Sequence, residues 1–196
     1  MRKSNLTEIK ELAAKSREAV WRIAKSYGRD PKIYLHWSAG HYGSFFDSYH
    51  INIDFDGSLH IATDNFADVL SHTYKRNSGS IGLTMACCVG GNTANLGSEP
   101  PTAKQIEAMA ECIQVIADAW WLTIDRDHVL THGEAADNID GIYPHEAYGP
   151  LSTVERWDLQ YLGTNESPKY LRTYDDPATG GNVLRGKALW YHNKKK

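Results

Sequence analysis

Two histidines stand at the ends of short apolar segments, where they could hold a metal ion. His36 lies near the end of the apolar run 32–37, and His132 directly follows the apolar run 129–131. Catalytic zinc is held by three protein ligands, with a fourth position left to water. The pair therefore indicates a zinc site whose third ligand would be a His, Cys, Asp or Glu side chain.

The segments that carry these histidines are predicted to be buried β-strands. Both runs are short and apolar, and small residues follow each of them. Open α/β sheets place their chemistry at the carboxyl ends of the strands. If both strands belong to one sheet, the two imidazoles point into a cleft at one edge of that sheet.

Helices and further strands surround these two segments. Asn5 and Glu8 begin an amphipathic helix that ends at Gly28, and Thr102 with Gln105 forms a capping box for a second helix. Alternating residues on both sides of an Asp-Gly turn predict a hairpin over 49–61, and residues 80–89 predict a central strand. This alternation predicts a single α/β domain, bordering on α+β, with a central mixed sheet flanked by helices.

The rest of the chain shows weaker patterns. Residues 133–150 look like a loop, and residues from 167 onward look like a polar surface wrap with a frayed basic end. We divide the chain into an N-terminal helix packed on the domain (1–31), the central domain that carries both histidines (32–162) and a C-terminal extension that wraps the same domain (163–196).

Composition excludes several classes of protein. The 196 residues carry 21 Lys and Arg against 24 Asp and Glu, a formal charge of −3, which argues against binding nucleic acid by phosphate neutralisation. No apolar run is long enough to span a membrane, and the charged N-terminus leads us to expect no signal peptide and synthesis in the cytoplasm. Three cysteines, two of them adjacent, form no disulfide framework, so we interpret them as buried reduced thiols.

Five sequence pieces, in family order, resemble the zinc-dependent N-acetylmuramoyl-L-alanine amidases of the type-2 amidase and peptidoglycan-recognition-protein family. No single piece is specific to this family, but the occurrence of all five in the family's order is strong evidence of the resemblance. The pieces are Ile33-Tyr34-Leu35-His36-Trp37-Ser38-Ala39, Tyr49-His50-Ile51-Asn52-Ile53 with Asp56-Gly57, Arg76-Asn77-Ser78-Gly79-Ser80-Ile81-Gly82-Leu83, Thr131-His132-Gly133-Glu134 and Glu155-Arg156-Trp157-Asp158-Leu159.

The resemblance implies that His36, His132 and Asp158 are the ligands of Zn²⁺. The interval from His132 to Asp158 is longer than is usual in the family, which leaves rival third ligands. The rivals are His145, Asp137 and Asp140. Asp158 is favoured because Arg156 stands two positions before it, where many members have a basic residue, and because His145 lies in a Tyr-Pro-His-Glu loop.

Three further residues are candidates for catalysis. By resemblance, Tyr49 lies beside the metal-bound water and Arg156 faces the same site, where either could stabilise an oxyanion. Glu134 could shuttle a proton or orient an imidazole. Each also has a structural interpretation: Tyr49 as a core residue, Arg156 as a surface charge paired with Glu155 or Asp158, and Glu134 as a solvated side chain.

The resemblance implies hydrolysis of the amide between N-acetylmuramic acid and L-alanine in peptidoglycan. We expect a monomer that acts on the cell wall after holin-type or other release, as a phage lysin does, or on muropeptides in the cytosol. Neither nucleic acid nor membrane insertion is expected. Two alternatives stay open: a non-catalytic peptidoglycan-binding module of the same fold, and a zinc hydrolase of another amide.

Overall fold

The computed structural model of the chain describes residues 1–142, 158–171 and 173–194. One six-stranded sheet, ordered β1-β4-β3-β5-β2-β6, forms its centre. The strands are β1 (Arg2–Ser4), β2 (Lys32–Trp37), β3 (Ile51–Ile53), β4 (Leu59–Ile61), β5 (Ser80–Met85) and β6 (Val129–Thr131). The helices are α1 (Leu6–Ser26), α2 (Ala103–Trp120), α3 (His132–Ala136) and α4 (Gly180–Lys194).

The sheet is mixed, as predicted. Strands β3, β5, β2 and β6 run parallel, whereas β4 is antiparallel to both β3 and β1. All residues of β2 and β5 are buried, which explains why their sequences are nearly continuous apolar runs rather than alternating ones. The prediction of a single α/β domain with a mixed central sheet and flanking helices is confirmed.

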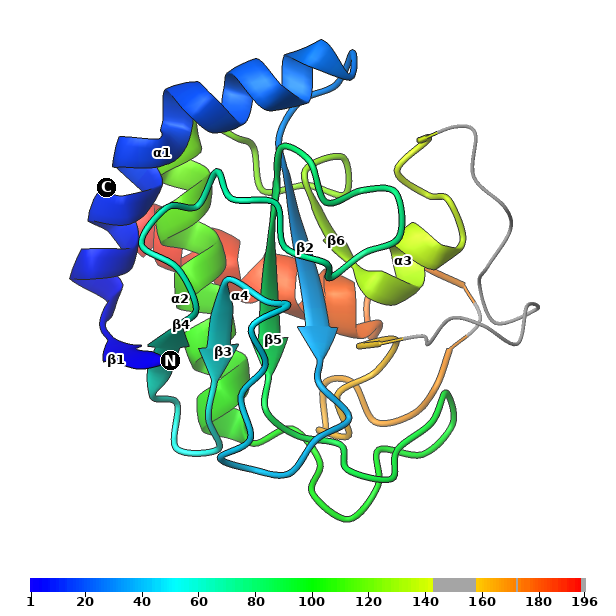
Figure 1. Cartoon of the computed structure of the whole chain (residues 1–196). Helices are drawn as coiled ribbons and strands as arrows, with labels where there is room; N and C mark the ends of the chain where they lie inside the picture. Colours follow the sequence, from blue (N-terminus) through cyan, green and yellow to red (C-terminus); the bar gives the residue numbers. More distant parts are fainter. Residues whose placement is uncertain (143–157, 172, 195–196) are drawn as a thin grey trace.

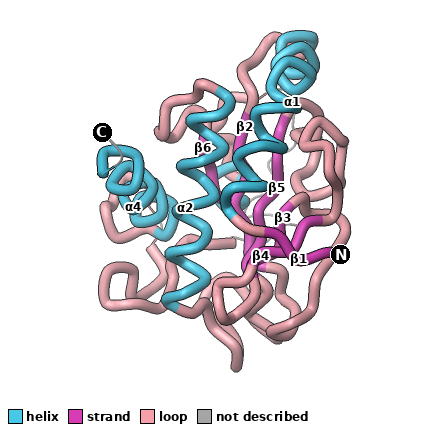
Figure 2. The backbone as a smooth tube through the Cα atoms, turned by 90° about the vertical axis from the view of Figure 1, so that its left-hand side faces the viewer, coloured by secondary structure: helices cyan, strands magenta, loops and turns pink. Residues whose placement is uncertain are grey.

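Helix α2 lies on one face of the sheet, behind β3 and β5 in Figure 1, and Figure 2 shows it between α4 and the strands. Its predicted capping box is present: the Thr102 hydroxyl accepts from Gln105 N, and the Gln105 side chain accepts from Thr102 N. Helix α1 packs against α2 and is capped by Asn5, as its sequence predicts. Helix α2 packs on β3 and β5 and so helps to hold the central strands of the sheet in place.

Three elements differ from the predictions. Residues 132–136 form the short helix α3, although the sequence suggested a loop. The C-terminal region contains the 15-residue helix α4, which packs on α2 and β6 and buries Leu184 and Ala188, where a polar wrap was expected. The edge strand β1 was not predicted. Helix α3 has a local signal, the capping box of Thr131 and Glu134. Contacts with the rest of the domain stabilise α4 and β1.

The interior holds the three cysteines as free, buried thiols, as predicted. Burial raises the pKa of the Cys112 and Cys87 thiols well above the ordinary range, so both stay protonated at neutral pH. None of the described helices combines the length and the apolar character needed to cross a bilayer.

Candidate metal centre

The parallel pairing of β2 and β6 brings His36 and His132 together. Leu35 pairs with Thr131, and the residue that follows each of them is one of the two histidines. Their ring centroids lie 4.8 Å apart, and their exposed fractions are 0% and 5%. The prediction that both imidazoles share one edge of the sheet is confirmed.

Asp158 joins the two histidines from a segment far along the chain. Its Oδ2 lies 3.5 Å from His36 Nδ1 and 3.3 Å from His132 Nδ1, and the carboxylate is fully buried. One ligand atom from each of the three residues lies within 4.8 Å of the others. Of the described residues, these three form the one such group of His, Cys, Asp or Glu.

The dimensions of this group suit zinc. Ligand atoms about 2.1 Å from a tetrahedral ion lie about 3.4 Å apart. The two distances between imidazole nitrogens and Asp158 Oδ2, 3.5 and 3.3 Å, match that spacing. Two imidazoles and one carboxylate are also the kind of donor set that zinc enzymes use, with one position left for water. The residues present therefore fit the ion that the sequence suggested.

Thr73 holds the His36 ring from the other side. Its Oγ1 lies 3.3 Å from His36 Nε2 and 2.9 Å from His72 Nδ1, and all three side chains are buried. The amide oxygen of Asn77 accepts hydrogen bonds from the backbone N–H groups of His72 and Thr73, which fixes their loop. With Nε2 engaged by the threonine hydroxyl, Nδ1 of His36 is the nitrogen that faces Asp158.

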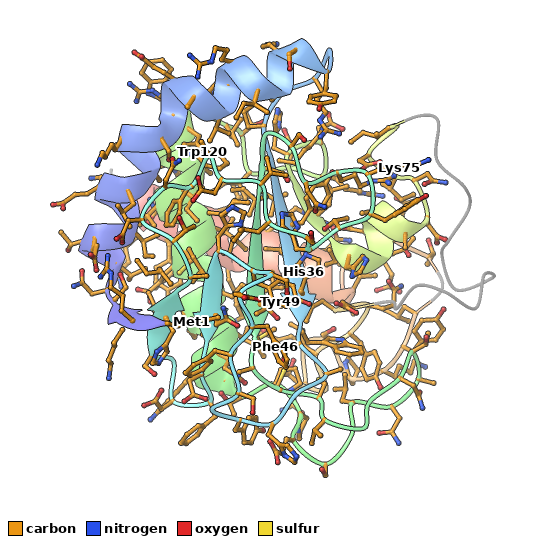
Figure 3. All side chains as sticks on the ribbon, in the orientation of Figure 1. Met1, His36, Phe46, Tyr49, Lys75 and Trp120 are labelled. Carbon is orange, nitrogen blue, oxygen red and sulfur yellow. The ribbon has the colours of Figure 1, made fainter. Side chains whose placement is uncertain are left out.

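Tyr49 lies beside His36, as Figure 3 shows, with the two ring centroids 5.0 Å apart. Its exposed fraction is 7%, so it closes one side of the site. Its position beside the metal-bound water, which the family resemblance implies, stays a prediction. The placement beside His36 is compatible with both interpretations of Tyr49, a core residue and a group that contacts the substrate.

The other two catalytic candidates have different outcomes. Both carboxylate oxygens of Glu134 bind Arg185, at 2.7 and 2.9 Å, and the Glu134 side chain is 1% exposed. Glu134 is therefore a buried, paired residue, and the expectation of a solvated side chain is wrong. Arg156 lies outside the described residues.

Two of the rival third ligands are engaged elsewhere. Asp140 accepts hydrogen bonds from Arg76 Nε at 2.6 Å and from Tyr34 Oη at 2.9 Å. Asp137 accepts from Tyr174 Oη at 3.0 Å, and burial raises the pKa of its carboxyl group. His145 lies outside the described residues. Within the described part of the chain, Asp158 is the carboxylate that reaches both histidines.

Sequence reasoning missed Thr73 and Arg185. Threonine gives no chemical signal of its own, and Thr73 lies 37 residues from His36. Arg185 lies 51 residues from Glu134, in a segment whose helix was not predicted. No short-range pattern marks either contact, although Glu134 at the third position after Thr131 is a capping-box signal that could have assigned it a structural role.

Several solved structures resemble the chain loosely. They include the endolysin amidase LysCS from Clostridium intestinale (17% identity, 54% of this chain and 71% of that chain, TM-score 0.39). The Ph2119 endolysin from a Thermus scotoductus bacteriophage shares 19% identity over 59% of this chain and 77% of that chain, with a TM-score of 0.42. PGRP-LB from Drosophila shares 15% identity over 84% of this chain and 82% of that chain, with a TM-score of 0.40. All these TM-scores are below 0.5, so they say nothing about activity. No curated protein matches the sequence.

A family model gives the decisive comparison. Residues 13–147, more than half of the chain, match the model described as N-acetylmuramoyl-L-alanine amidase. The matched stretch contains β2 to α3 and both histidines of the metal centre, whereas Asp158 lies beyond it. The chain therefore belongs to the N-acetylmuramoyl-L-alanine amidase family.

Proposed function

We propose that this protein is a zinc-dependent amidase that hydrolyses the bond between the lactyl group of N-acetylmuramic acid and the L-alanine of the peptidoglycan stem peptide. One observation carries the proposal: in a chain of the amidase family, His36, His132 and Asp158 offer ligand atoms that all lie within 4.8 Å of one another. The substrate would be the cell wall or soluble muropeptides derived from it.

His36, His132 and Asp158 would hold the ion through two neutral imidazoles and one carboxylate. Bound zinc would supply a water molecule whose pKa falls toward about 7, together with polarisation of the scissile carbonyl group. Asp158 offsets one of the two positive charges of the ion, which leaves a net positive site for the developing oxyanion. Thr73 keeps the His36 ring in the orientation that presents Nδ1.

Among the described residues, Tyr49 is the side chain proposed to act on the substrate. Its ring packs beside His36, so its hydroxyl could donate a hydrogen bond to the oxyanion or orient the attacking water. Arg156 is proposed as a second donor on the sequence alone. A guanidinium stays charged at any relevant pH, which suits the stabilisation of negative charge.

Product analysis tests the proposal. Purified peptidoglycan is incubated with the zinc-loaded protein, with the protein after chelation, and with His36→Ala. We expect mass spectrometry to detect stem peptides with a free N-terminal L-alanine only for the zinc-loaded wild type. His192→Ala serves as a matched control, because His192 binds Asp118 on the α2–α4 face.

Three outcomes would contradict the proposal. Cleavage by His36→Ala equal to that of the wild type would exclude a role for the metal centre. Tight binding of peptidoglycan without any cleavage would indicate a binding module, and cleavage of a different bond would indicate another amide substrate.

A further inference from the structure

We propose that Arg185, with the Gly180–Gly181 turn that begins α4, positions the metal ligands His132 and Asp158. This inference rests on the proposed metal centre and extends it to the C-terminal helix. The family match ends at residue 147, so neither α4 nor Asp158 belongs to the matched region. The C-terminal segment would thus help to position the metal ligands in this chain.

Arg185 binds Glu134 through a two-pronged ion pair. Its Nη1 donates to Glu134 Oε2 at 2.9 Å and its Nη2 donates to Oε1 at 2.7 Å. Nη1 also donates to Val129 O, and Nη2 to Asn182 Oδ1, each at 2.7 Å. Because both charged side chains are almost fully buried, the guanidinium fixes the carboxylate with little freedom.

Glu134 in turn fixes the backbone on both sides of His132. Its Oε2 accepts from Thr131 N at 2.9 Å, and its own N–H donates to Thr131 Oγ1 at 3.1 Å. His132 is the first residue of α3 and lies inside this capping box. Any shift of the Glu134 carboxylate would therefore change the direction in which the His132 imidazole leaves the backbone.

The beginning of α4 packs equally closely on the residue after Asp158. Gly180 N donates to Gln160 O at 3.1 Å, and a Cβ atom at Gly180 would clash with Leu159 O. Leu159 itself has a φ of +62°, a strained value for a leucine that persists only where the surroundings enforce it. The helix end therefore sets the backbone that carries the third ligand.

Gly181, the residue after Gly180, packs against the ion pair of Glu134 and Arg185. A Cβ atom there would lie 3.0 Å from both carboxylate oxygens of Glu134 and 3.1 Å from Arg185 Nη2. Tyr174, which precedes α4, adds a hydrogen bond from its hydroxyl to Gly133 O at 2.9 Å. One face of the C-terminal region thus contacts the backbone beside both His132 and Asp158, with Glu134 and Leu159 as the points of contact.

The test compares Arg185→Met with Lys187→Met in the full chain. Lys187 is on the same helix but pairs with Glu107 and Glu166, away from Glu134, so it is a matched control for losing a cation from α4. We expect Arg185→Met to weaken zinc binding, measured by chelator competition, by roughly 10- to 100-fold. Lys187→Met should leave the affinity unchanged, and Arg185→Lys should restore only part of it.

A second variant guards against loss of folding. The double variant Glu134→Gln/Arg185→Gln leaves no unpaired buried charge, so it should fold and still bind zinc more weakly, because the two-pronged pair is gone. Cobalt(II) substituted for zinc gives an absorption spectrum that depends on ligand geometry, and this spectrum should change in both Arg185 variants. A role in stability alone would leave that spectrum unchanged.

Amide exchange gives a readout that needs no metal. In the metal-free protein, the peptide containing residues 129–137 should exchange faster in Arg185→Met than in Lys187→Met. Unchanged zinc affinity, cobalt spectrum and exchange in folded Arg185 variants would overturn the positioning role while leaving the amidase proposal intact. A wild type that takes up no zinc would instead overturn both the amidase proposal and this extension of it.

Discussion

Two imidazoles from distant parts of the chain meet around one carboxylate oxygen. His36 and His132 both turn Nδ1 toward Asp158 Oδ2, and Thr73 engages the far nitrogen of the His36 ring. The two histidines could be predicted from the sequence, because each stands at the end of an apolar strand. Asp158 was identified only through the family resemblance, since no local pattern distinguishes it from Asp137 or Asp140.

Replacement of Tyr49 by Phe separates its two interpretations. The ring packs against His36, so the phenylalanine variant keeps that contact and removes only the hydroxyl. If the hydroxyl stabilises the transition state, kcat should fall by about 100-fold while zinc affinity stays the same. A kcat equal to that of the wild type, measured on the same muropeptide, would show that Tyr49 is a core residue.

His50 gives a prediction about pH. Its Nδ1 accepts from Gly82 N at 3.1 Å and its Nε2 donates to Asp68 O at 2.9 Å, which holds the ring neutral. Burial lowers the pKa of His50 from 6.5 to about 4. The unfolded chain therefore binds a proton below pH 6.5 that the folded chain takes up only near pH 4.

It follows that His50 stabilises the fold fully above pH 6.5, and that this contribution is lost as the pH falls toward 4. The loss amounts to about 3 kcal/mol. Titration of the His50 ring by NMR should give a midpoint near 4, and a midpoint near 6.5 would contradict the buried, neutral state. Burial also lowers the pKa of His72, so this residue should likewise make the fold less stable as the pH falls.

At the scale of elements, the predictable parts are those with local signals. The caps of α1 and α2 and the strands β2 and β5 all follow from residues next to one another in the sequence. Helix α4 has no such signal, because its apolar residues are not confined to one face: Leu184 and Ala188 are buried, whereas Leu189 and Trp190 are exposed. Its stability comes from packing on α2 and β6. The Arg185–Glu134 pair that it supplies was therefore invisible to sequence reasoning.

The contact between α1 and the entry to β5 can be tested with two glycines. Gly79 and Gly28 have nearly the same positive φ, +68° and +70°. A Cβ atom at Gly79 would lie 2.7 Å from the backbone of Ala24 in α1, whereas one at Gly28 would meet nothing within 4 Å. The two positions therefore share the backbone strain of an alanine and differ only in the steric clash.

Gly28→Ala should lower the free energy of unfolding by about 1 kcal/mol, the cost of a left-handed alanine. Gly79→Ala should cost about 1–3 kcal/mol more, because α1 must move away from the sheet. Urea denaturation of both variants measures the difference. Equal losses would mean that α1 does not pack against Gly79 as closely as described.

At the scale of the whole molecule, the three proposed ligands come from β2, α3 and the segment after residue 157, so a zinc ion bound by them would link these three parts of the domain. Zinc that binds only the folded state should raise stability by mass action, by about 2.7 kcal/mol at a free concentration 100 times the dissociation constant. Urea denaturation with and without zinc should show this gain for wild type and for His192→Ala. An equal gain in His36→Ala would place the zinc elsewhere.

The central claim is that His36, His132 and Asp158 bind a zinc ion. Anomalous diffraction from crystals of the zinc-loaded protein, recorded on both sides of the zinc absorption edge, tests it most directly. We expect one strong peak about 2 Å from Nδ1 of each histidine and from the Asp158 carboxylate. A peak that uses another third ligand, such as His145, or no peak between the two histidines, would contradict it.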